Sequence, residues 1–288
     1  MDSKYYKNLA YHEMGNENEK IILFLHSKIV SKWIWTKQME GYDKYFKDYH
    51  CIFVDLPHHG ESQSDGKFSI NESSDIIIDF LEDLLKNKEN ENKIKLSKPV
   101  NIVALGIGAS IAIEILNKKP ELVNHLILSG LEIADRKESK ESSIINIIGK
   151  TKAEYLNEKP DSFITKAYLR YFGIKKDYYD FMENDLDMRI QKEKEIAFES
   201  LNYTIPNNLN NKILDKKEIL LAYGNKEDLS CTYSAIKLKN IFKNARLIEI
   251  NKGNHLWNLI DWELFNRTII DFIENDHIIN DEKIKIIE

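Results

Sequence analysis

Short, largely apolar runs alternate with amphipathic segments along the first part of the chain. The runs cover residues 21–25, 51–54 and 100–105, and turn residues follow each of the first two. Such a run is typical of a strand that is buried on both faces of a parallel sheet. Between the second and third runs, residues 73–85 place apolar side chains at helical spacing, which predicts a crossover helix. The pattern therefore predicts strand–helix–strand units.

The same alternation continues to residue 129 and resumes after residue 210. It predicts a helix over 106–117 and a strand over 125–129, and later strands over 218–223 and 246–250 with helices over 233–242 and 262–273. Alternating elements of this kind favour a mostly parallel central sheet flanked by helices, with right-handed crossovers. The polar segment 86–98 is expected to be a solvated connection without regular structure.

Residues 132–209 interrupt this alternation. The segment is rich in charged and aromatic residues and contains amphipathic patterns but no strand pattern. We expect an all-helical insertion, which covers the core as a cap. The core is then formed by residues 1–131 and 210–288, and no linker divides the chain into independent domains.

Composition narrows the classes of partner. The 288 residues carry a net charge of −6, with acidic residues interspersed among the lysines, and this excludes the basic surface that tracks nucleic acid. The sequence contains no apolar run long enough to span a membrane and no secretory signal pattern. Cys51 and Cys231 lie far apart and lack metal-ligand spacing, so we expect free thiols and a cytoplasmic protein. Nothing in the sequence indicates an oligomeric state.

Chemistry-bearing residues gather where the predicted strands end. The third strand leads into Ala104-Leu105-Gly106-Ile107-Gly108-Ala109-Ser110, a run of small residues at a tight strand-to-helix turn. Such a turn builds the nucleophile elbow of one class of hydrolases. Four further motifs follow strands: His26-Ser27 with Trp33-Ile34-Trp35, the loop 55–62, and two loops that contain Gly224-Asn225-Lys226-Glu227-Asp228 and Gly253-Asn254-His255.

Taken together, these motifs resemble those of the α/β-hydrolase superfamily, in particular its small, cap-bearing, esterase-like bacterial members. The resemblance covers nearly the whole chain. It implies an α/β-hydrolase fold and an ester-hydrolase ancestry, with a small-molecule ligand or substrate held between core and cap and no cofactor. It also implies the catalytic order nucleophile, acid, histidine.

The nucleophile position departs from the family pattern. Aligned on Gly108 and on the helix that follows, the position of the family's serine is occupied by Gly106, so the usual nucleophile is absent. A second register uses Ser110 as the nucleophile instead and shortens the helix by about one turn. In the first register Ser110 is an ordinary small residue of the helix.

The other catalytic positions are retained in the resemblance. His255 matches the family's histidine, and its orienting acid is Glu227, with the adjacent Asp228 as the alternative. An acid at this position holds the imidazole in one tautomer and stabilises the imidazolium form.

The resemblance also places an oxyanion hole and a binding surface. The hole is expected from the backbone N–H groups of Lys28 and Ile107, beside Ser27, which replaces the family's usual glycine. Trp33 and Trp257, with Tyr178 and Tyr179 of the insertion, are expected near a ligand. His26, His58 and His59 are explained by the loops that contain them, so we expect no metal.

Three functions remain open from the sequence. The protein is a diverged family member that only binds a small molecule or a partner, or a lyase or non-covalent hydrolase in which His255 and Glu227 still perform acid–base chemistry. The third possibility is a serine esterase that uses Ser110, or one whose natural serine is changed in this chain. Whether the protein is an enzyme is therefore not decided by the sequence.

Overall fold

The computed structural model describes residues 2–28, 30–92, 99–133, 178, 180–181, 193–207, 209 and 216–288. Within this part of the chain, nine strands form a single sheet in the order β1-β2-β4-β3-β5-β6-β7-β8-β9. The strands are β1 (Lys4–Tyr6), β2 (Leu9–Met14), β3 (Lys20–Leu25), β4 (Tyr49–Val54), β5 (Val100–Leu105), β6 (Val123–Ser129), β7 (Glu218–Gly224), β8 (Arg246–Ile250) and β9 (Ile284–Ile287).

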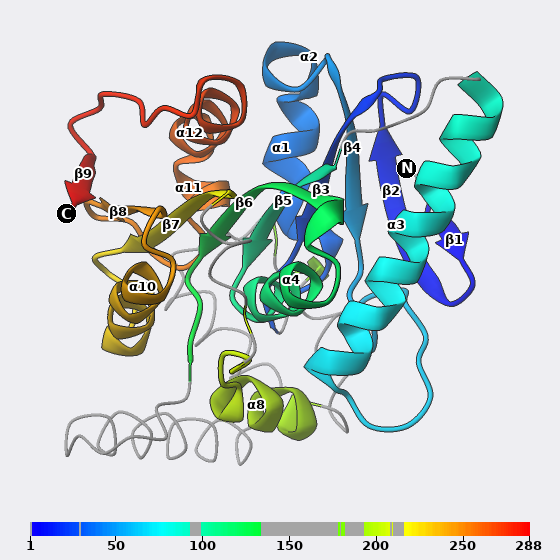
Figure 1. Cartoon of the computed structure of the whole chain (residues 1–288), viewed down its shortest axis with the longest axis horizontal. Coiled ribbons are helices and arrows are strands. Elements are labelled where there is room, and N and C mark those ends of the chain that lie inside the picture. The colour runs from blue at the N-terminus through cyan, green and yellow to red at the C-terminus, as the bar shows by residue number, and fades with distance from the viewer. Residues whose placement is uncertain are drawn as a thin grey trace.

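The six central strands, β4, β3, β5, β6, β7 and β8, run parallel to one another. The antiparallel pairings lie at the two margins, where β1 pairs with β2, β2 with β4, and β8 with β9 (Figure 1). Because parallel strands end at the same edge, the loops after β3, β5, β6, β7 and β8 all meet there. This edge is where open α/β sheets bind their ligands.

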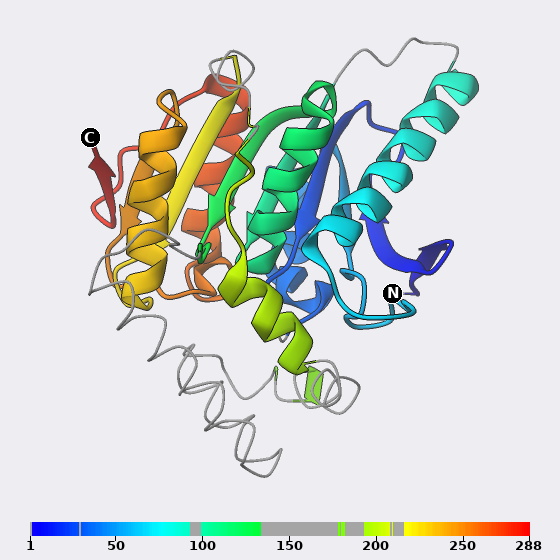
Figure 2. The ribbon, with the colours of Figure 1, turned by 60° about the horizontal axis from the view of Figure 1, so that its bottom comes forward.

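Helices cover both faces of the sheet, as Figures 1 and 2 show. On one face lie α3 (Ile70–Asn92), α4 (Ile107–Lys118) and α10 (Leu229–Ile241), and on the other lie α1 (Thr36–Glu40), α2 (Tyr42–Tyr45), α11 (Trp257–Ile260) and α12 (Trp262–Asn275). Two 3₁₀ helices, η1 (Lys32–Trp35) and η2 (Pro120–Leu122), and α8 (Glu193–Asn202) complete the described helices.

Strand β3 shows how the sequence builds two cores. Ile21, Leu23 and Leu25 pack into the core under α3 and α4, whereas Ile22 and Phe24 pack into the core under η1 and α12. Successive side chains of a strand point to opposite faces, so an uninterrupted apolar run is what a strand covered on both faces requires.

The predicted fold class is confirmed, with corrections to several element bounds. Helix α3 continues to Asn92, although residues 86–92 were expected to lack regular structure. Lysine and glutamate propagate a helix well. The buried Lys88 also ties this part of α3 to the core, since its Nζ donates to the carbonyl of Asn18 at 3.0 Å.

Strands β1, β2 and β9 escaped the sequence patterns because each lies at a sheet margin and shows no continuous apolar run. Most of the insertion predicted over 132–209 lies outside the described residues, among them Tyr179. The described helix in that range is α8, whose Ile196 packs into the core under α3 and α4. No helix among the described residues is both long and apolar enough to cross a membrane.

Candidate functional site

The turn between β5 and α4 has the geometry of a nucleophile elbow but contains glycine. Strand β5 ends at Leu105, α4 begins at Ile107, and Gly106 between them adopts φ 51° and ψ −116°. Other residues adopt a positive φ only at a cost of about 1–2 kcal/mol. Ser110 lies inside α4 and is buried, so the register with Gly106 at the turn is the one that the fold adopts.

The loops after β7 and β8 bring an acid and a histidine together. His255 Nδ1 lies 3.2 Å from Glu227 Oε2, and the other carboxylate oxygen, Oε1, accepts a hydrogen bond from the Gly224 N–H at 2.9 Å. The Glu227 side chain is 1% exposed and that of His255 is 13% exposed. Glu227 therefore holds the ring through Nδ1, while the adjacent Asp228 serves as the N-cap residue of α10.

Gly130, directly after β6, makes room for this pair. Its φ is +62°, and a Cβ placed on it would lie 2.5 Å from His255 Nδ1 and 2.9 Å from Glu227 Oε2. Real Cβ atoms do not approach other heavy atoms so closely. The absence of a side chain at residue 130 thus allows the imidazole and the carboxylate to meet.

The loop after β3 adds a hydroxyl group to the contact between Glu227 and His255. Ser27 Oγ lies 2.7 Å from His255 Nε2, on the opposite side of the ring from Glu227. A Cβ built on Gly106 would lie only 2.2 Å from Ser27 Oγ and 3.1 Å from His255 Nε2. The serine hydroxyl therefore occupies the space into which a side chain at the elbow would project.

His26 fixes the backbone that carries Ser27. Its Nε2 accepts a hydrogen bond from the Leu56 N–H at 2.9 Å, so the proton of the neutral ring lies on Nδ1, which donates to the Ser27 carbonyl at 2.7 Å. His59 Nδ1 in turn lies 2.9 Å from the Pro57 carbonyl, and the His26 and His59 rings meet edge to face. These contacts give the two histidines structural roles in the loops.

Lys28 attaches the same loop to the end of β6 through an ion pair. Its Nζ lies 2.7 Å from Glu132 Oε2, and Glu132 Oε1 accepts a hydrogen bond from Ser230 Oγ at 2.9 Å. The Lys28 ammonium lowers the pKa of Glu132 to about 2. Burial by itself lowers the pKa of Lys28, but the Glu132 carboxylate outweighs it, so the pKa of Lys28 is raised.

The two tryptophans expected near a ligand make different contacts. Trp33, in η1, stacks on Tyr178 of the insertion, with ring centroids 5.7 Å apart and an interplanar angle of 22°. Trp257 is buried, donates from Nε1 to Ser129 Oγ at 3.0 Å and packs edge to face on Phe265. Both tryptophans are buried in the core under α12, and Trp33 in addition contacts Tyr178.

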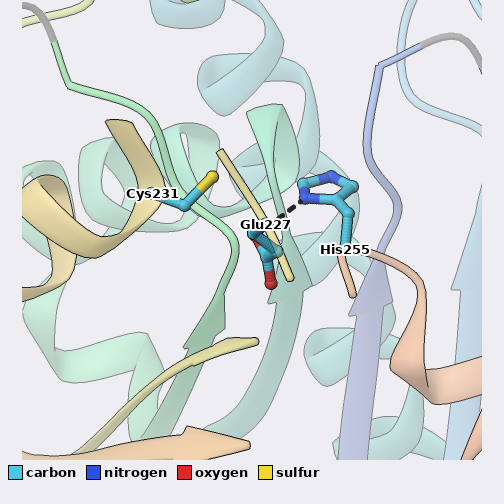
Figure 3. A group of neighbouring side chains, drawn as sticks. All are labelled: Glu227, Cys231 and His255. Carbon is cyan, nitrogen blue, oxygen red and sulfur yellow. Dashed lines mark hydrogen bonds and ion pairs between the residues drawn. The ribbon is translucent and has the colours of Figure 1, made fainter. Parts of the chain in front are cut away.

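Cys231, in the first turn of α10, lies beside the acid and the histidine (Figure 3). One ligand atom each from Glu227, Cys231 and His255 lies within 4.8 Å of the other two. Burial raises the pKa of the Cys231 thiol well above its usual range. The thiol donates to the Gly130 carbonyl at 3.7 Å.

Comparison with known proteins identifies the fold. The structure matches an esterase from Exiguobacterium antarcticum with a TM-score of 0.70 and 16% identity, over 93% of this chain and 96% of that chain. It matches MGS-M2, an α/β-hydrolase enzyme from a Medee basin deep-sea metagenome library, with a TM-score of 0.69 and 16% identity over 98% and 100%. The chain has the α/β-hydrolase fold.

A thermophilic esterase from Thermogutta terrifontis matches the same fold with a TM-score of 0.65 and 17% identity, over 93% of this chain and 94% of that chain. No protein-family model and no curated protein sequence matches the chain. At these identities the likeness shows the α/β-hydrolase fold alone.

Sequence patterns identified the loops of the site but missed the contacts that three of its residues make with Glu227 and His255. Gly130 follows the buried strand β6 directly, and a glycine in that place was a usable signal. Cys231 gave no signal, because its approach to Glu227 depends on how α10 packs. Ser27 was expected beside the oxyanion hole, but its contact with His255 depends on the small residue at position 106.

Proposed function

We propose that the chain hydrolyses esters of small molecules, with His255 as the general base and Glu227 as the acid that positions it. One observation carries the proposal. His255 is bound to the buried Glu227 through Nδ1, which leaves Nε2 facing the start of α4, where an ester carbonyl lies in enzymes with this fold. A positioned histidine contributes about 10²–10⁴-fold to such a reaction.

The chemistry of the pair fits proton transfer. The carboxylate accepts the Nδ1 proton, so Nε2 of the neutral ring has the lone pair that takes a proton from an attacking oxygen. The positive charge that then develops on the ring lies against the Glu227 carboxylate, which stabilises it. The proposal also places the small-molecule substrate between the core and the predicted cap, and Trp33 stacked on Tyr178 supports that position.

The structural neighbours support the reaction class. Several of the matched chains are described as esterases or hydrolases, which makes ester hydrolysis the first activity to test. The alternative of a protein that only binds a small molecule rests on Gly106, since the usual nucleophile is absent there.

Hydrolysis of p-nitrophenyl acetate and butyrate tests the proposal. We expect turnover by the unaltered protein, and a fall in kcat/KM of at least about 10²-fold in His255→Ala and of a smaller amount in Glu227→Gln. Asp228→Asn is the matched control for Glu227→Gln and should retain activity. Equal rates in the unaltered protein and in His255→Ala would contradict the proposal and favour a binding protein.

A further inference from the structure

We infer that Ser27 is the covalent nucleophile of this site, so that the reactive hydroxyl comes from the loop after β3 and not from the elbow after β5. The inference deepens the proposed function and rests on it. That proposal requires a base at His255 but leaves two candidates for the attacking oxygen, water or a side chain. Among the described residues, Ser27 has the hydroxyl that the structure places on the base.

The contact has the geometry of a nucleophile and its base. Ser27 Oγ and His255 Nε2 are 2.7 Å apart, within the range of about 2.6–3.2 Å at which a base takes the proton of a nucleophile. Glu227 holds the opposite nitrogen of the ring at 3.2 Å. The order hydroxyl, imidazole, carboxylate is thus complete, with each group in contact with the next.

The space for this arrangement exists because residue 106 is glycine. A Cβ on Gly106 would lie 2.2 Å from Ser27 Oγ and 3.1 Å from the Ser27 Cβ, so a serine at the elbow and the present Ser27 side chain exclude each other. The glycine at position 106 and the serine at position 27 are therefore sterically coupled, because the present position of the Ser27 hydroxyl requires that residue 106 has no side chain.

Close packing of α4 against the end of β3 holds Ser27 at the start of α4. A Cβ on Gly108 would lie 2.6 Å from the carbonyl oxygens of both Leu25 and His26, so the first turn of α4 lies directly on the backbone that leads to Ser27. His26 holds the Ser27 carbonyl at 2.7 Å. The Ser27 hydroxyl is therefore fixed at the start of α4 by packing on one side and by a hydrogen bond on the other.

The start of α4 also supplies a donor for the developing oxyanion. The Gly106 N–H donates a hydrogen bond to the Ser129 carbonyl at 2.9 Å. Ile107 is the first residue of α4, and the first N–H groups of a helix have no hydrogen-bond partner within the helix. The positive end of the dipole of this twelve-residue helix favours negative charge at the same place. We therefore assign the donor role to the Ile107 N–H, as the sequence also predicts.

The reaction proceeds in two balanced steps. Ser27 Oγ forms a bond to the acyl carbon while its proton passes to His255 Nε2, and the C–O bond to the alcohol then breaks as the alcohol takes that proton. A water molecule next attacks the acyl carbon and gives a proton to His255 Nε2. The bond to Ser27 Oγ breaks, the serine recovers the proton, and the products are one carboxylic acid and one alcohol.

A fluorophosphonate probe tests this inference directly, since a nucleophilic serine attacks its phosphorus and expels fluoride. We expect one adduct on each chain, mapped to Ser27 by mass spectrometry of the peptides. The adduct should be lost in Ser27→Ala and in His255→Gln, and kept in the matched control Ser110→Ala. Ser27→Ala should also lower kcat/KM for p-nitrophenyl butyrate by about 10⁴-fold or more. Circular dichroism and a thermal melt check that each variant is folded.

The outcomes separate this inference from the proposed function. Turnover that depends on His255 but persists in Ser27→Ala overturns the inference, leaves the proposed function intact and assigns the attack to water. An adduct on Ser27 without ester turnover supports the inference and contradicts the proposed function. An adduct on Ser110, or no adduct on the unaltered protein, overturns the inference even if Ser27→Ala does not fold.

Discussion

The ends of two adjacent strands, β3 and β5, share two features that one turn usually combines, namely the backbone of a nucleophile elbow and a hydroxyl group. The turn after β5 keeps the backbone of a nucleophile elbow, with Gly106 at φ 51° and ψ −116°, but has no side chain. The loop after β3 has the hydroxyl of Ser27, at 2.7 Å from His255 Nε2. The turn after β5 is defined by its backbone conformation and the loop after β3 by its side chain. The two lie side by side because α4 packs closely on the end of β3.

The backbone frame of a site and its reactive atom therefore need not lie on the same residue. The base, its acid and the start of α4 surround a small volume, and either residue 27 or residue 106 has room to place an oxygen there. A missing serine at the elbow is therefore weak evidence for the loss of activity until the neighbouring loop is examined.

Among variants that keep the hydroxyl, the base and the acid, the largest effect is expected from a methyl group at the elbow. In Gly106→Ala the added Cβ lies 2.2 Å from Ser27 Oγ, so Ser27 must leave His255, and we expect kcat/KM for p-nitrophenyl butyrate to fall by about 10³-fold. The positive φ also destabilises the variant by about 1–2 kcal/mol. Steady-state kinetics and chemical denaturation measure the two effects.

Gly66→Ala is the matched control for this variant. Gly66 has a positive φ of +76°, but nothing lies within 4 Å of an added Cβ. Its alanine variant should lose similar stability and keep full activity. If the two variants had equal kcat/KM values, the contact between Ser27 and His255 would have no part in catalysis.

A smaller loss is expected when the other side of the histidine is disturbed. In Gly130→Ala the added Cβ lies 2.5 Å from His255 Nδ1, so the ring must shift away from Glu227 while Ser27 stays in its loop. We expect kcat/KM to fall by about 10²-fold, because a misplaced base loses most of its contribution. Fluorophosphonate labelling of Ser27 should slow in parallel. Labelling at the unaltered rate would show that the Glu227–His255 contact does not position the base.

The smallest effect concerns the anchor of the β3 loop. Lys28 lowers the pKa of Glu132 to about 2, so the ion pair stabilises the fold above the ordinary carboxyl pKa, and this stabilisation is lost as pH falls towards 2. We expect Lys28→Met to lower the free energy of unfolding by about 2 kcal/mol at pH 7.

Denaturation of both proteins between pH 7 and pH 3 measures this effect. The difference in free energy of unfolding should narrow below about pH 4, as Glu132 becomes protonated in the unfolded chain. A difference that stays constant from pH 7 to pH 3 would show that the pair does not stabilise the loop. Lys20→Met, at an exposed position on β3, serves as the control.

The sequence predicts the parallel centre of this fold well, because β3, β4 and β5 are apolar runs buried on both faces. It fails at the margins, where β1, β2 and β9 show no such run, and at the end of α3, where Lys88 finds partners that lie far away in the sequence. Loops that contain His255 and Glu227 are equally visible in the sequence. Their contacts with Ser27 and Gly130 are not, because these depend on distances between strand ends.

The most direct test exchanges the residues at positions 27 and 106. The double variant Ser27→Gly with Gly106→Ser moves the hydroxyl back to the elbow, and its rate of p-nitrophenyl butyrate hydrolysis is measured beside both single variants. We expect each single variant to be nearly inactive, Ser27→Gly for lack of an oxygen and Gly106→Ser because the two side chains collide. The double variant should recover at least 10-fold over either. Full activity in Ser27→Gly alone would show that Ser27 is not the nucleophile.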